Sequence, residues 1–366
     1  MTITAAVTEA AGEPFQVQEV DIEDPRAGEV LVRMAASGIC HTDLLVSGGT
    51  FPTPLPVVLG HEGAGVVAGV GPGVTGLAEG DRVALSYDSC GACASCAGGR
   101  PFHCHGFFMR NFGAAREDGS TALSKDGTPI HSHFFGQSSF ATHAVVPQAS
   151  VVKLGDDVPL ELVAPFGCGI QTGAGAVMNA LRPPPGSSIL VTGAGGVGLS
   201  AVMAANVVGC TTIIASDLRP ARLELARELG ATHTIDASGN VEEEVDAITG
   251  GGVAYSVEAS GSTKALRTAV DALAPGGGVC GAVGAPPLGE EVSLDVNTLI
   301  GQGKTIRGVA EGESVPRVFI PVLIELWKAG KFPVDRMMRT YELDAINEAA
   351  EHAEQGETIK PVLLMA

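Results

Sequence analysis

The sequence contains few aromatic residues, few charges and no long unbroken apolar run. Phe, Trp and Tyr make up only 4% of 366 residues, so we expect a core built from Ala, Val, Leu and Ile. The 22 basic residues are outnumbered by 41 acidic ones, a net charge of −19, which disfavours nucleic acid and anionic membranes as partners. Between Leu162 and Ser216 the only charge is Arg182, but prolines and glycines divide this stretch into pieces below the ~20 residues that span a bilayer.

The N-terminus lacks the features of an export signal, and the cysteines are unevenly spaced. Residues 1–9 have no basic start and no apolar run, so we expect a cytoplasmic protein whose thiols stay reduced. Half of the eight cysteines form C-x2-C-x2-C-x7-C, namely Cys90, Cys93, Cys96 and Cys104. Four thiolates so spaced predict a closed, structural zinc site. Cys210 and Cys280 receive no role beyond packing.

Two kinds of pattern divide the chain. Before about residue 165, short β-rich segments are separated by Gly and Pro, as at 29–34, 63–70 and 141–146. From about residue 169, predicted strands at 188–192, 211–216, 231–235, 253–257 and 278–283 alternate with helices. This alternation predicts an α/β fold with a doubly wound parallel sheet. Two helices (315–329, 345–354) and a strand (359–364) end the chain and return to the first domain, so we assign residues 1–169 and 311–366 to one domain and 170–310 to the other.

A glycine-rich turn lies between the first predicted strand and helix of the second domain. The turn reads G-A-G-G-V-G, and its candidate coenzyme-binding residues are Gly193, Gly195, Gly196, Val197 and Gly198. Asp217 ends the next strand, where a carboxylate accepts hydrogen bonds from the adenosine ribose. The pattern predicts a Rossmann domain that binds NAD rather than NADP, although Arg219 and Arg222 are close enough in sequence to weaken that preference.

A second set of metal-binding residue types is dispersed along the chain. Cys40, His61 and Cys168 provide the ligand types of a catalytic zinc whose fourth position is open. Spacing alone supports this weakly, since single buried cysteines usually belong to a core.

Several motifs occur together in one order: G-I-C-H-T-D at 38–43, G-H-E-G at 60–63, the four-cysteine lobe, G-C-G-I-Q-T-G-A-G-A at 167–176 and the turn at 193–198. This chain resembles the zinc-dependent medium-chain alcohol dehydrogenases along essentially its whole length. Residues 314–321 and Gln171 resemble the branch that oxidises aryl (benzyl) and allylic alcohols. The resemblance implies a GroES-like catalytic domain, NAD, two zinc ions per chain (one catalytic, one structural), and a homodimer, with a tetramer as the alternative.

The resemblance also implies roles for individual residues. Cys40, His61 and Cys168 would bind zinc, Thr42 would hydrogen-bond the substrate oxygen, and Asp43 and Glu62 would lie beside the ligands. Thr172 would contact the nicotinamide, and His41 and Lys360 the coenzyme phosphates. The alcohol pocket would be formed by aromatic walls and small residues, namely Phe134, Phe135, Ser86, Ala285 and Ala310.

One position departs from the family pattern, and two other functions compete. Leu45 stands where many members carry the histidine that passes the proton to solvent, so the proton would leave through ribose hydroxyls to His41 or directly to water. A thiol-adduct (glutathione- or mycothiol-type) formaldehyde dehydrogenase shares these motifs and would use basic residues such as Arg110 and Arg116 to bind the thiol carrier. A non-catalytic scaffold is the remaining reading, which the complete set of catalytic residues disfavours. We therefore expect an enzyme that converts a primary alcohol to an aldehyde with NAD.

Overall fold

The computed structural model describes residues 1–365, which form two compact units. One unit comprises Met1–Cys168, Val315–Glu325 and the chain from Val334 onward, and the other comprises Gly169–Ser314 and Leu326–Pro333. No helix within residues 1–365 is both long and apolar enough to cross a membrane.

The first unit contains two sheets, as the β-rich N-terminal pattern predicts. One sheet has the order β4-β1-β2-β7-β8, with strands Val57–Val58, Thr2–Thr8, Gln16–Ile22, Leu123–Lys125 and Thr128–Ile130. The other has the order β10-β6-β5-β3-β18-β17, with β9 also paired to β3. Its strands are Val151–Lys153, Arg82–Leu85, Glu62–Val70, Glu29–Gly38, Lys360–Leu364, Met338–Glu342 and, for β9, His143–Pro147.

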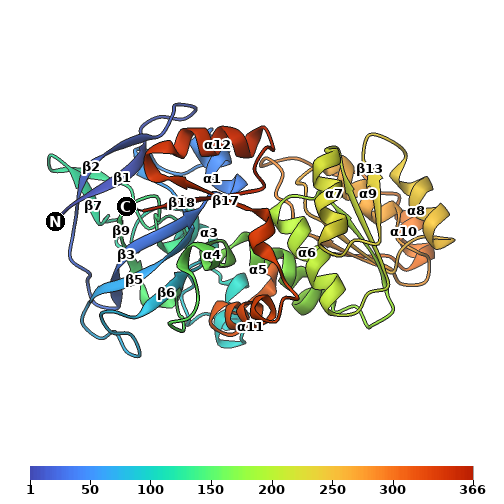
Figure 1. The fold of residues 1–366 in the computed structure, drawn as a ribbon, viewed down its shortest axis with the longest axis horizontal. Coiled ribbons are helices and arrows are strands. Elements are labelled where there is room, and N and C mark those ends of the chain that lie inside the picture. Colours follow the sequence, from blue (N-terminus) through green and yellow to red (C-terminus); the bar gives the residue numbers. More distant parts are fainter. Residues whose placement is uncertain (366) are drawn as a thin grey trace. The chain divides into compact units, whose positions relative to one another are not determined.

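The C-terminal segment completes this unit. Strand β18 pairs antiparallel with β3 and parallel with β17 (Figure 1). The helices of the unit are short: α1 (His41–Ser47), α2 (Ala94–Ala97), α3 (Phe107–Phe112), α4 (Leu160–Val163) and α12 (Ile346–Glu354). One core cluster of this unit includes Val7, Leu59, Phe140 and Leu363, all fully buried. The aliphatic core that the composition predicts therefore also contains a few large aromatic side chains.

The second unit contains a six-stranded sheet in which every pair of strands is parallel. Its order is β13-β12-β11-β14-β15-β16, with strands His233–Asp236, Thr212–Asp217, Ser188–Thr192, Tyr255–Glu258, Val279–Ala282 and Thr305–Gly308. The helices are α5 (Gly169–Gly175), α6 (Gly196–Val207), α7 (Pro220–Glu228), α8 (Val241–Thr249), α9 (Thr263–Asp271) and α10 (Val296–Gln302), while α11 (Pro316–Lys328) belongs partly to each unit. Numbered from β11, this is the 3-2-1-4-5-6 order of Rossmann domains, which confirms the predicted fold class.

Small residues allow α6 to pack closely on this sheet. Ala201, Ala204 and Ala205 are fully buried, and the helix contacts β11, β12 and β14. Gly193 has φ +87°, which lets the chain turn sharply between β11 and α6. The glycine-rich turn and Asp217, which ends β12, therefore lie at the carboxyl ends of adjacent strands.

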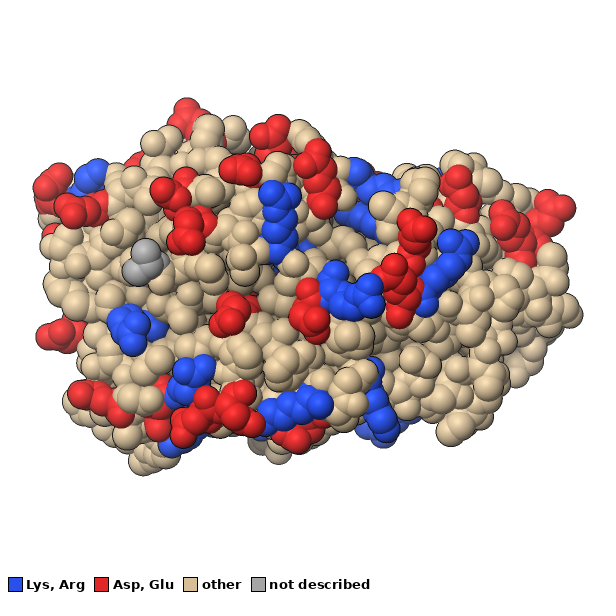
Figure 2. All heavy atoms as spheres, viewed as in Figure 1, with Lys and Arg blue, Asp and Glu red and all other residues tan. Residues whose placement is uncertain are grey.

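Surface charge follows the acidic composition. On the face drawn in Figure 2, Lys and Arg side chains are interspersed with Asp and Glu rather than gathered in one broad patch. This face presents no extended positive surface of the kind that nucleic acids require.

Candidate active site

Cys40 lies where strand β3 gives way to helix α1. It is the N-cap of that helix, and its backbone N–H donates to Asp43 Oδ2 at 2.9 Å. The carboxylate of Asp43 thus satisfies an amide of the first helical turn. The motif at 38–43 therefore fixes the position of the Cys40 backbone.

His61 precedes strand β5 and is fully buried. Its Nδ1 lies 2.8 Å from Asp43 Oδ1, which also accepts the Gly60 N–H at 3.1 Å. Because a carboxylate only accepts, Nδ1 carries the proton, and the neutral tautomer then has its lone pair on Nε2. His61 Nε2 is buried and has no hydrogen-bond partner. A neutral imidazole held in this way is suited to bind a metal ion.

Cys168 completes a three-residue cluster. The ligand atoms of Cys40, His61 and Cys168 all lie within 4.8 Å of one another. A hydrogen bond from Cys168 lowers the pKa of the Cys40 thiol, against the effect of burial. Two sulfurs, one of them favoured as thiolate, and an orphaned imidazole nitrogen fit a zinc ion with an open fourth position.

Two predicted residues follow Cys40 on helix α1. Thr42 Oγ1 lies 3.9 Å from Cys40 Sγ, so its hydroxyl borders the cluster. His41 is exposed, and Leu45 is half-buried. A histidine in contact with solvent therefore precedes the threonine directly.

Glu62 and Lys360 form a buried ion pair beside the cluster. Lys360 Nζ donates to Glu62 Oε1 at 2.9 Å, to Glu62 Oε2 at 2.8 Å and to Ile39 O at 3.1 Å. Lys360 is 4% exposed and Glu62 is fully buried. Although burial opposes it, the charge of Glu62 raises the pKa of Lys360. All three donors of the ammonium group are used inside the unit, so its predicted contact with coenzyme phosphate stays a prediction.

The four clustered cysteines come together in a separate lobe. Their sulfur atoms lie within 4.8 Å of one another, and backbone N–H groups of Cys90, Cys93 and His105 donate to sulfurs of the cluster at 3.3–3.5 Å. The bond from His105 N–H is the largest cause that lowers the pKa of Cys93 to about 6. His103 and His105 side chains are exposed. Four sulfurs fit a tetrahedral zinc with no position left for substrate.

The glycine-rich turn of the second unit is tied to Asp217. Asp217 accepts the Ala194 N–H at 2.7 Å and the Arg219 N–H at 2.9 Å, and Arg222 Nη1 lies 3.7 Å from its Oδ2. A Cβ on Gly198 would lie 1.7 Å from Gly193 O, whereas one on Gly195 would meet nothing within 4 Å. The open space at Gly195, at the N-terminus of α6, fits a phosphate group.

Other predicted residues lie as follows. Thr172 is on α5, and its hydroxyl is buried without a hydrogen-bond partner. Ser86 is fully buried and donates to Gly167 O at 2.6 Å. Ala285 is exposed and Ala310 half-buried. The assignment of these residues to the coenzyme and alcohol pockets stays a prediction.

The two predicted aromatic walls pack on His61. The ring of Phe135 stacks on the imidazole with centroids 4.5 Å apart, and Phe134 meets it edge-on at 5.6 Å. Both rings are buried, Phe134 completely. Phe135, with φ +50°, and three neighbours have left-handed backbone, a strain of about 1–3 kcal/mol each for residues other than glycine. Neither composition nor periodicity signals this strained segment.

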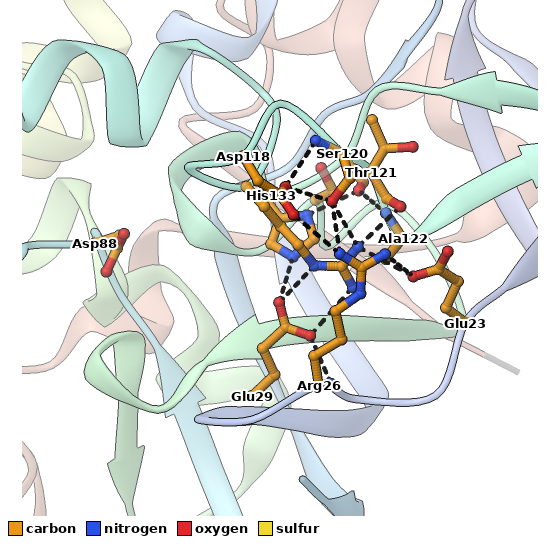
Figure 3. A network of polar contacts seen from close by, with 12 residues as sticks. Glu23, Arg26, Glu29, Asp88, Asp118, Ser120, Thr121, Ala122 and His133 are labelled. Carbon is orange, nitrogen blue, oxygen red and sulfur yellow. Dashed lines mark hydrogen bonds and ion pairs between the residues drawn. The ribbon is translucent and has the colours of Figure 1, made fainter. Parts of the chain in front are cut away.

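A second buried polar network lies in the first unit (Figure 3). Arg116 binds Glu29 through two bonds of 2.7 and 3.1 Å, and Arg26 N–H donates to the same carboxylate at 2.8 Å. Glu29 is 8% exposed. Arg110 pairs with Asp88 at 2.8 Å. These residues border a cavity of about 740 Å³, so the two arginines considered for a thiol carrier are already paired with carboxylates.

The chain was compared with known families and proteins. Residues 26–156 match the alcohol dehydrogenase GroES-like domain family, and residues 196–328 match the zinc-binding dehydrogenase family. Geraniol dehydrogenase of Castellaniella defragrans is 47% identical over 363 residues, which cover 98% of this chain and 97% of that one. S-(hydroxymethyl)glutathione dehydrogenase of Paracoccus denitrificans is 36% identical over the full length of both chains. The crystal structure of benzyl alcohol dehydrogenase from Acinetobacter calcoaceticus has a TM-score of 0.97 at 48% identity and covers all of both chains.

Proposed function

The chain belongs to the zinc-binding alcohol dehydrogenase family, and from this premise we propose that it interconverts primary aromatic or allylic alcohols and their aldehydes with NAD. The observation that carries the proposal is the cluster of Cys40, His61 and Cys168, with an unpartnered imidazole nitrogen beside two sulfurs. The substrate class is supported by similarity to a geraniol dehydrogenase and a benzyl alcohol dehydrogenase at 47% and 48% identity.

We propose two zinc ions per chain. Cys40, His61 and Cys168 would hold the catalytic ion, and the four-cysteine lobe would hold a structural one. NAD is favoured over NADP because Asp217, at the end of β12, would repel a 2′-phosphate. When bound, zinc would polarise the substrate oxygen as a Lewis acid, and NAD⁺ would accept the hydride.

The protein's own groups would orient the ligands and move the proton. Asp43 holds the proton of His61 on Nδ1, which leaves Nε2 for the metal. Thr42 Oγ1, which borders the cluster, would accept the proton that leaves the alcohol hydroxyl. Leu45 has no group that could carry this proton onward, so we propose that the proton leaves through the exposed side chain of His41. His41→Ala should then slow proton release and lower kcat, and an unchanged kcat would contradict this route.

The thiol-adduct formaldehyde reaction is the weaker candidate. The S-(hydroxymethyl)glutathione dehydrogenase is 36% identical to this chain, against 47% for the geraniol dehydrogenase. Arg110 and Arg116, which would have to bind the carboxylates of a thiol carrier, are occupied by Asp88 and Glu29. Both arginines are therefore already paired with carboxylates of the chain itself.

A substrate panel separates these activities. Formation of NADH would be followed with benzyl, cinnamyl, geranyl and short aliphatic alcohols, and with formaldehyde plus glutathione or mycothiol. We expect the highest kcat/KM with the aromatic or allylic alcohols. Activity restricted to the formaldehyde–thiol mixtures would overturn the substrate assignment, and no NADH from any mixture would favour a scaffold.

We also propose a cytoplasmic homodimer, with a tetramer as the alternative. Strand β16 is one of the two edge strands of the Rossmann sheet within the described residues, and most of it is exposed. Val296 and Ile300 on neighbouring α10 are 61% and 73% exposed. An exposed edge beside apolar side chains is suited to pairing with the same edge of a second copy. Light scattering after size-exclusion chromatography would give the mass of the assembly.

A further inference from the structure

The segment from His133 to Phe140 has an unusual backbone. His133, Phe135, Gly136 and Ser138 all have positive φ, between 50° and 66°. Three of them are not glycine, and bulky residues rarely adopt this conformation. Such strain persists only where surrounding contacts hold it, and it is concentrated at functional sites. We therefore expect the contacts that hold this segment to serve the function of the protein.

Gln137, inside that segment, binds the backbone on both sides of Glu62. Its Nε2 donates to His61 O at 2.8 Å, and its Oε1 accepts the Gly63 N–H at 3.0 Å. The side chain is 1% exposed. The Gln137 amide thus binds the carbonyl of His61 and the N–H of Gly63, the backbone groups on either side of Glu62, as a neighbouring strand would.

The close approach of this segment explains the glycines of G-H-E-G. A Cβ on Gly60 would lie 2.6 Å from Phe140 N, and one on Gly63 would lie 2.8 Å from the Ser139 Cβ. Neither position has room for a larger residue. Glycine on each side of His61 and Glu62 therefore lets the segment reach the backbone that it binds.

His61 is consequently held at several places. Asp43 binds Nδ1, Phe135 covers one face of the ring, and Gln137 binds the main-chain carbonyl. The side chains fix the orientation of the ring, whereas Gln137 fixes the backbone from which it extends. Of the two ring nitrogens, Nε2 is the one without a hydrogen-bond partner.

We propose that Gln137 is a positioning residue that keeps His61 in place for the metal ion. This inference rests on the proposed binding of zinc by Cys40, His61 and Cys168. Groups that orient metal ligands typically contribute about 10–100-fold to metal affinity. Gln137 acts through the backbone of His61 and touches neither substrate nor coenzyme in this role.

The test compares Gln137→Met with a matched control. Methionine is similarly long and unbranched, but it forms neither hydrogen bond. Gln148 makes the same pair of contacts with the backbone N–H and carbonyl of Thr75, at an exposed site. Gln148→Met therefore removes equivalent bonds away from the cluster. Zinc-loaded wild type and both variants would be exposed to excess chelator, and native mass spectrometry would count the remaining zinc with time.

The four-cysteine zinc serves as an internal reference, because global loosening would release both ions faster. The phase of release that coincides with loss of NADH formation identifies the catalytic ion. We expect Gln137→Met to accelerate that phase about tenfold or more, with the other phase unchanged and Gln148→Met like wild type. Equal acceleration of both phases, or none, would overturn the proposal.

A second variant tests the same inference in case Gln137→Met does not fold. Gln137→Glu keeps the size and the acceptor for Gly63 N–H but, in its ionised form, cannot donate to His61 O. It should also release the catalytic zinc faster than wild type, despite its added negative charge, and an unchanged rate would overturn the proposal. Wild-type protein with fewer than two zinc ions would instead contradict the proposed function, so the two failures are distinguishable.

Discussion

Lys360→Met tests the buried ion pair beside the candidate metal site. The ammonium group makes two bonds to Glu62 and one to Ile39 O, all between 2.8 and 3.1 Å, and both charged residues are almost completely buried. Methionine fills similar space but leaves the Glu62 carboxylate without its partner. Breaking a buried pair in this way typically costs about 3–5 kcal/mol of unfolding free energy. We expect a loss in that range.

The double variant Glu62→Met/Lys360→Met gives the decisive comparison. Replacing both charges by apolar groups of similar volume is often neutral, so the double variant should be more stable than Lys360→Met. The free energy of unfolding would be measured in urea by circular dichroism, with chelator present so that metal release does not contribute. A loss below about 1 kcal/mol in Lys360→Met would refute the reasoning. So would a double variant whose loss of unfolding free energy equals the sum of the losses of Glu62→Met and Lys360→Met measured separately.

Three further predictions concern other parts of the chain. Asp43→Asn should weaken zinc binding at the three-residue cluster about 10–100-fold; chelator competition measures this, and unchanged affinity would contradict the role of Asp43. Gly198→Ala should prevent stable folding because its Cβ would meet backbone, whereas Gly195→Ala should fold and raise KM for NAD; melting temperatures and KM values check both. Burial raises the pKa of Glu29, but hydrogen bonds from His133 and Arg116 outweigh burial and hold that pKa below its ordinary 4.5. This carboxylate therefore stabilises the fold above about pH 4.5, and its contribution is lost as the pH falls towards the pKa of the folded state. Glu29→Gln should therefore be less stable than wild type at pH 7, with a smaller difference at pH 3, and equal urea midpoints at pH 7 would show the reasoning to be wrong.

The sequence predicts the Rossmann unit well because its signals are local. Strands β11 to β15 lie within about two residues of their predicted positions, with helices between them as expected, since apolar runs separated by glycine-rich turns determine each element. The parallel pairing follows from the alternation of strands and helices. Helix α12 and strand β18 agree with prediction equally well.

The contacts of the site depend on distant segments and are harder to predict. Lys360 meets Glu62 because β18 pairs with β3, a pairing between residues about 300 positions apart. The family resemblance implied that Lys360 contacts the coenzyme phosphates, but it did not indicate that Lys360 pairs with Glu62. Likewise, the left-handed backbone at Phe135 and the stacking of its ring on His61 join segments far apart in the sequence, whereas the predicted role of Phe135 in the alcohol pocket stays a prediction.

The central claim is that Cys40, His61 and Cys168 support oxidation of an aromatic or allylic alcohol by NAD. The most direct measurement is the rate of NADH formation from cinnamyl alcohol by zinc-loaded wild type and by His61→Ala. We predict rapid NADH formation by the wild type and none above background by the variant, which should still retain the zinc of the four-cysteine lobe. Equal rates in the two proteins, or no NADH from the zinc-loaded wild type, would contradict the account.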